Sequence, residues 1–120
     1  MDATFTTDAL GRLICDLSHL VSHATVTSSD AAAAAAGLRD ALDSVALQGT
    51  GECFWPEAGG DYRWMFRKED GTLTLVVLWS SGTLTGWEHV FWGQADLEPF
   101  TRLLLDRLSG VTSTARPSPL

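Results

Sequence analysis

A cysteine and two histidines recur at a regular spacing near the start of the chain. Cys15, His19 and His23 stand four residues apart, so on a helix they would form one row along a single face. Thiolate and imidazole are ligands of zinc and copper. A straight row over two helical turns cannot close a tetrahedral shell by itself, so we interpret it as a polar helix face. We expect no metal and no other cofactor, with this row kept as the alternative metal site.

The chain also holds the residue types of a cysteine nucleophile with a base: Cys53, His89 and a carboxylate such as Glu57, Asp61 or Glu88. Their context does not support catalysis. There is no nucleophile elbow, no helix start after Cys53 and no cationic neighbour that would lower the pKa of its thiol. The glycines of "EAGGD" form no phosphate-binding pattern and lead into a strand. We therefore predict a protein that is not an enzyme.

Charge and length narrow the class of protein further. Among 120 residues, 15 are acidic and 8 basic, giving a net charge of -7 with no cluster of lysine or arginine. This acidic balance excludes nucleic acid and anionic membranes as partners and favours a basic protein as partner.

The chain is expected to form one domain over residues 1–110 with a disordered tail over 111–120. Two cysteines in separate elements and a start without a signal pattern predict a cytoplasmic protein without a membrane anchor.

Two helices are expected before any strand. The first is predicted from apolar residues at helical spacing: Leu10, Leu13, Ile14, Leu17, Leu20 and Val21. Gly11 is the only weak helix former within it. Ser29 and Asp30 can cap a second helix with the body "AAAAAAGLRDALDSVAL". A short strand is possible around Cys53 to Trp55, and Asp96 is expected to cap a final helix.

From Asp61 the apolar period changes to two. Asp70-Gly71 is a favoured turn dipeptide of a two-residue hairpin, and placing it at the turn pairs Phe66 with Leu75, Trp64 with Val77 and Tyr62 with Trp79. A third strand follows in "WEHVFWG". The prediction is an α+β fold of two N-terminal helices, a three- to four-stranded antiparallel meander and a C-terminal helix packed on the sheet.

The second face of this sheet mixes apolar residues with arginines: Arg63, Met65 and Arg67 opposite Leu78, Val76 and Thr74. The third strand adds either Trp87, His89 and Phe91 or Glu88, Val90 and Trp92, and the turn before it does not decide which. Either the helices cover both faces within the monomer, or a second copy or a partner covers this one. Trp and Arg are enriched at binding hot spots, so the expected partner-binding residues are Trp55, Arg63, Arg67, Trp87 and Trp92.

The segments "YRWMFRKEDGTLTLVVLW" and "HVFWGQADLEPFTRLLLDRL" resemble short uncharacterised proteins of high-GC bacteria, and that likeness implies no activity. In size, acidity and element order the chain is similar in kind to toxin-immunity proteins and small acidic secretion chaperones. The resulting hypothesis is a protein-interaction module that binds a protein partner, forms a homodimer, or both. The alternative is a protein that binds a small ligand in its Trp-rich half or a metal at the Cys15 row.

Overall fold

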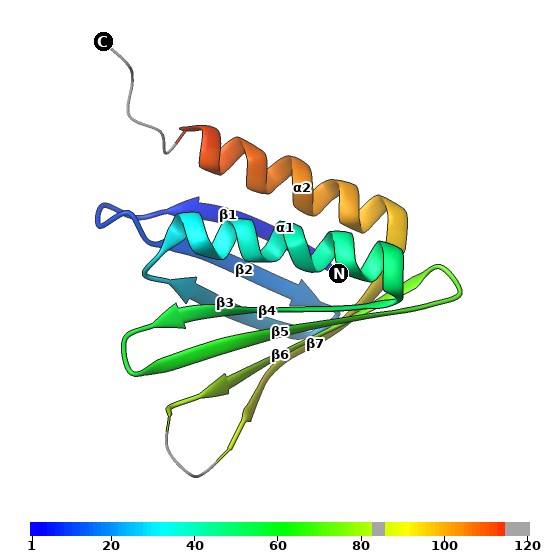
Figure 1. The fold of residues 1–120 in the computed structure, drawn as a ribbon, viewed down its shortest axis with the longest axis horizontal. Coiled ribbons are helices and arrows are strands. Elements are labelled where there is room, and N and C mark those ends of the chain that lie inside the picture. Colours follow the sequence, from blue (N-terminus) through cyan, green and yellow to red (C-terminus); the bar gives the residue numbers. More distant parts are fainter. Residues whose placement is uncertain (83–85, 115–120) are drawn as a thin grey trace.

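The computed structural model describes residues 1–82 and 86–114 and shows an α+β fold of two helices and seven strands in two antiparallel sheets (Figure 1). The elements follow in the order β1 (Asp2–Thr7), β2 (Leu13–His19), β3 (Ser22–Ser28), α1 (Ala31–Gln48), β4 (Thr50–Glu57), β5 (Gly60–Glu69), β6 (Thr72–Ser80), β7 (Glu88–Asp96) and α2 (Leu97–Thr114). In this described part of the chain, neither helix is long and apolar enough to cross a membrane.

The predicted first helix is wrong, because its residues form the sheet β1-β2-β3. Leu13, Cys15 and Leu17 of β2 alternate with more exposed neighbours and are fully buried. A spacing of four residues joins Leu13 to Leu17 on one side of a strand as well as of a helix, so this pair fits both periods. Gly11 stands at a φ of +79° in the β1–β2 turn. The apparent weak point of a helix is therefore the turn between two strands.

Helix α1 confirms the second predicted helix. The Asp30 side chain accepts a hydrogen bond from the Ala33 backbone N–H at 3.1 Å, and Gly49 ends the helix at a φ of +87°. The helix lies alongside β4, at the edge of the second sheet (Figure 1). Gly51 permits this approach, because a Cβ atom there would collide with the carbonyl oxygen of Ala41.

The second sheet has the strand order β4-β5-β6-β7 and confirms the predicted hairpin. Its register pairs Phe66 with Leu75, Trp64 with Val77 and Tyr62 with Trp79. At the turn, Asp70 has a φ of +50° and Gly71 of +84°, as a type I′ turn requires at both central positions. Turn chemistry and apolar pattern therefore indicate the same register.

A β-bulge in β7 answers the open question about its two faces. The register passes from Val77↔Phe91 to Leu78↔His89, so Val90 has no partner in β6. Alternation is interrupted there. Phe91 is buried with the core while Trp92 is exposed, and His89 shares its register position with Leu78 on the other face. Neither of the two expected residue sets is therefore found as a unit.

The two sheets and both helices bury their inner faces in one core. Trp55, Trp64 and Phe91 are the largest side chains in it, each at most 1% exposed. Helix α2 contributes Phe100, Leu104 and Leu108 and lies next to β1 and α1. It runs to Thr114, so the first four residues of the expected tail are helical, and residues 115–120 lie outside the described part.

Candidate binding surface

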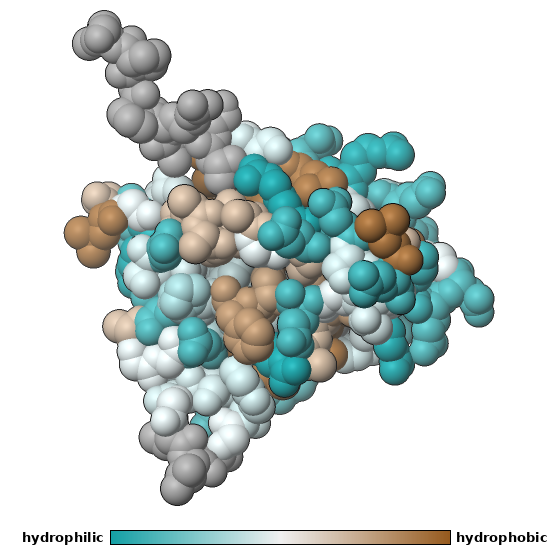
Figure 2. All heavy atoms as spheres, in the orientation of Figure 1, coloured by the Kyte–Doolittle hydropathy of each residue, from teal (hydrophilic) through white to brown (hydrophobic). Residues whose placement is uncertain are grey.

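The side of the β4–β7 sheet that faces away from the core is called the outer face here. Its rows follow from the register. One row runs Glu52, Met65, Val76, Trp92 across the four strands, a second starts with Phe54, Arg63 and Leu78, and a third runs Thr50, Arg67, Thr74, Gln94. Among the described residues, neither α1 nor α2 covers this face (Figure 1). Figure 2 shows an apolar area over β4 and β5 with hydrophilic side chains around it.

At one end of the outer face, Phe54, Arg63 and Trp87 form the aromatic–arginine cluster. The Arg63 guanidinium carbon lies 5.8 Å from the Phe54 ring centroid and 5.6 Å from that of Trp87. The two rings are 6.2 Å apart. Glu52 holds the same guanidinium with two hydrogen bonds of 2.9 and 2.7 Å. Arg63 is thus fixed in place, while Phe54 and Trp87 remain 47% and 42% exposed.

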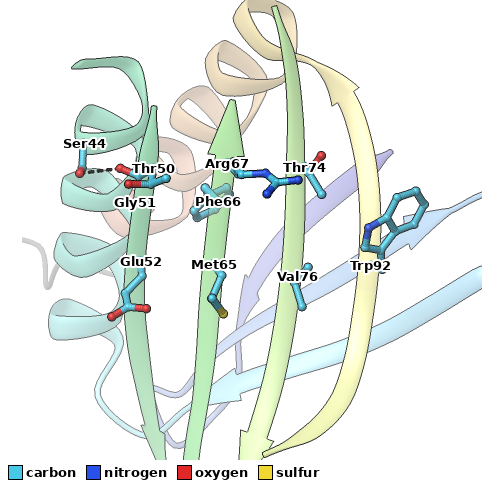
Figure 3. A pocket seen from close by; sticks show the side chains of 10 residues that line it. All are labelled: Ser44, Thr50, Gly51, Glu52, Met65, Phe66, Arg67, Thr74, Val76 and Trp92. Atoms are coloured by element: carbon cyan, nitrogen blue, oxygen red, sulfur yellow. Dashed lines mark hydrogen bonds between the residues drawn. The ribbon is translucent and has the colours of Figure 1, made fainter. Parts of the chain in front are cut away.

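At the other end, a groove of about 580 Å³ crosses the sheet. Figure 3 shows Glu52, Met65, Val76 and Trp92 side by side across the four strands, with Arg67 and Thr74 in the next row. Ser44 of α1 closes the β4 side and donates a hydrogen bond to the Thr50 carbonyl at 2.8 Å. The groove therefore has an apolar row from Met65 to Trp92, with the charged Glu52 at its β4 end and Arg67 beside Thr74 in the next row.

The apolar surface continues past Trp92 onto the turn between β2 and β3. The Trp92 and His19 rings meet edge to face, with centroids 5.5 Å apart. His19 ends β2, and the next two residues, Leu20 and Val21, form the turn. These two are 90% and 102% exposed. We call them the hairpin tip.

The structure divides the five expected partner-binding residues. Arg63 and Trp87 lie in the cluster, while Arg67 and Trp92 line the groove. Trp55 is fully buried and packs against Trp64 with ring centroids 4.8 Å apart. The expectation of an exposed anchor at Trp55 is therefore corrected: its neighbour Phe54 is the exposed aromatic residue of β4.

The two candidate chemical sites are not assembled. Because β2 and β3 are strands, Cys15, His19 and His23 form no row: Cys15 points into the core, and His23 lies in β3. No metal-binding group of three or more ligand residues occurs among the described residues. Cys53 belongs to the buried face of β4, whereas His89 shares the row of Leu78 on the outer face. A nucleophile and base on opposite faces of a sheet cannot exchange a proton directly.

Sequence reasoning did not identify Phe54 or the hairpin tip. Phe54 could have been placed by alternation, since it stands between Cys53 and Trp55, which share the other face. The hairpin tip had no such signal, because its two residues fitted the apolar stripe of the expected helix. Only the pairing of β2 with β3 exposes them.

No protein-family model, curated protein or solved structure matches this chain.

Proposed function

We propose that this chain is a non-enzymatic protein-interaction module that binds a protein partner through the aromatic–arginine cluster of its outer face. The observation that carries the proposal is the exposure of Phe54 and Trp87 around an Arg63 that Glu52 already holds in place. Aromatic residues and arginine dominate the energy of protein interfaces. A side chain that is ordered before binding also loses less conformational entropy when the partner arrives.

Charge favours a basic partner. The whole chain carries a net charge of -7, and Asp40 and Asp43 are exposed on α1. A negative surface speeds the diffusional approach of a positive protein, while the aromatic contacts set how long the complex persists. Association should therefore slow as salt rises, with a smaller change in dissociation.

A small ligand in the groove is the second candidate. Its volume of about 580 Å³ falls within the range of small-molecule sites. The groove lies along an exposed sheet face, however. Arg67, the one cation among its described lining residues, has a side chain that is 66% exposed and paired with Glu69 at 3.2 Å. Such sites usually enclose their ligand and aim buried polar groups at it. These features support the protein partner more strongly.

The proposal is tested by affinity capture from the cell of origin with the wild type, a Phe54→Ser/Trp87→Ser double variant and a Leu47→Ser control. Leu47 is 84% exposed on α1, so its substitution removes a more exposed apolar residue away from the cluster. We expect a basic protein that the wild type and the control retain and that the double variant loses. Surface plasmon resonance with that protein should show an association rate that falls between 50 and about 300 mM salt. Equal capture by all three proteins would contradict the proposal.

A further inference from the structure

The hairpin tip places two large apolar residues where a two-residue turn usually carries polar residues or glycine. Leu20 and Val21 are 90% and 102% exposed. Leu20 also stands at a φ of +54°, a conformation that glycine and asparagine adopt far more readily than leucine. The tip is thus unfavourable for the isolated chain both in solvation and in backbone conformation. Such a combination points to a contact that the isolated chain does not make.

The groove on the outer face is a concave surface that could receive a convex one such as the hairpin tip. Met65, Val76 and Trp92 form its apolar row, which Figure 3 shows across β5, β6 and β7. The tip adjoins the Trp92 end, because His19 contacts the Trp92 ring. Leu20 and Val21 do not line the groove of their own chain, but they lie at the border that a second chain would approach.

We propose that the groove is occupied by the hairpin tip of a second copy of this chain. A two-fold axis close to Trp92 would bring Leu20 and Val21 of each copy over Met65 and Val76 of the other. The contact is then made twice by the same residues, as in a closed symmetric dimer. This goes beyond the proposed function. The groove shares Glu52 with the surroundings of the cluster, but Phe54, Arg63 and Trp87 do not line it, so the dimer leaves both aromatic–arginine clusters accessible.

Charge opposes a second copy only weakly at this place. Two chains of net charge -7 repel each other over most of their surfaces. The groove has one acidic residue, Glu52, and one basic residue, Arg67, and Leu20 and Val21 carry no charge. Repulsion between copies is therefore weak where the tip meets the groove.

The area fits a weak dimer. With strands about 4.8 Å apart and about 3.3 Å per residue along each, three residues on each of four strands give the groove on the order of 200 Å². Even with the two exposed tip residues added, both copies together bury less than about 1,200 Å², which is the range of weak, transient interfaces. We therefore expect dissociation in the micromolar range and not a permanent dimer.

The test is sedimentation equilibrium from about 1 to about 500 μM, a range that brackets micromolar dissociation. The wild type should pass from monomer to dimer. The tip variant Leu20→Asn/Val21→Ser should weaken the dimer at least about tenfold. The tip variant should melt at no lower a temperature than the wild type, since asparagine tolerates a positive φ.

The groove variant Met65→Gln/Val76→Thr should weaken the dimer as well. The control Leu10→Asn removes a leucine that is 83% exposed in the β1–β2 turn and should leave the dimer unchanged.

Mixing the two variants gives the sharpest result. Each variant alone has lost both copies of the contact, but a mixed dimer pairs the intact tip of the groove variant with the intact groove of the tip variant. Mixed dimers should therefore form more tightly than either variant with itself. A wild type that stays monomeric, a tip variant that dimerises like the wild type, or a mixture with no gain would each overturn the proposal. A monomeric wild type that still captures a partner through Trp87 would leave the proposed function standing.

Discussion

At the scale of single residues, both cysteines are built into the core. Cys15 is fully buried and Cys53 is 6% exposed. Burial raises the pKa of the Cys53 thiol to about 12, with the nearby Glu52 carboxylate adding to the effect, and burial raises the pKa of Cys15 as well. A thiol reacts through its thiolate. Neither cysteine is therefore suited to nucleophilic chemistry in the folded protein.

We expect both thiols to resist alkylation in the native state. In iodoacetamide at pH 8, modification followed by mass spectrometry should proceed at least about 100-fold more slowly than in urea, because the ordinary pKa of a free thiol is about 8.5. The rate in urea serves as the internal control. Rapid native labelling of Cys53 alone would show that β4 opens or that its thiolate is stabilised.

At the scale of elements, the packing of α1 against β4 depends on a single glycine. A Cβ atom at Gly51 would collide with the Ala41 carbonyl oxygen and would stand 3.2 Å from the Val45 backbone nitrogen. Both neighbours belong to the helix backbone, which cannot rotate away as a side chain can. The helix lies against β4 at this distance only because position 51 has no side chain.

Gly51→Ala should therefore lower the free energy of unfolding by about 1–3 kcal/mol, measured by urea denaturation. The matched control is Gly110→Ala in α2, where an added Cβ atom meets nothing within 4 Å. There alanine should raise stability by about 0.5–1 kcal/mol, because it favours the helix. An unchanged stability of Gly51→Ala would mean that α1 can shift away from β4 at little cost.

At the scale of the whole molecule, hydrogen bonds between the end of β3 and the end of β4 join the two sheets. The Pro56 carbonyl accepts hydrogen bonds from the Ser29 backbone N–H at 3.1 Å and the Ser28 hydroxyl at 3.0 Å. Proline fits here because β4 is at the edge of its sheet. The Thr27 hydroxyl donates to Glu57 at 2.5 Å. This hydrogen bond lowers the pKa of Glu57 below 4.5, with help from the Ala58 backbone N–H and Arg12.

The lowered pKa makes this link depend on pH with a definite sign. The ionised Glu57 adds stability above pH 4.5, and the contribution is lost as the pH falls through the lower pKa of the folded state. Glu57→Gln should cost about 1 kcal/mol at pH 7 and should lose less stability than the wild type between about pH 5 and pH 3. Thermal melts across this range measure both.

Glu69→Gln is the control, since its side chain is 70% exposed and pairs only with Arg67 among the interactions described. It should change stability by less than about 0.5 kcal/mol at pH 7. Parallel pH profiles of wild type and Glu57→Gln would show that the Thr27–Glu57 contact does not stabilise the link between the sheets.

The sequence by itself determined those elements whose local signals agree with one another. In the β5–β6 hairpin, the Asp70-Gly71 turn and the alternation from Tyr62 indicate one register, and that register is found. Helix α1 has a capping residue at its start and a glycine at its end. In such segments local preference and burial act in the same direction, so no information from the rest of the chain is needed.

Tertiary structure decided whether the segment around β2 is a helix or a strand, and it decided which aromatic residues are exposed. Leu13 and Leu17 fit either period, and only pairing with β1 and β3 selects the strand. Phe54 and Trp55 are neighbours with similar preferences, yet the core that α1 and the first sheet build covers one and leaves the other exposed. Burial depends on which elements pack together, and that depends on residues far apart in the chain. The candidate surface is therefore a property of the folded chain, because its residues become neighbours only when both sheets have formed.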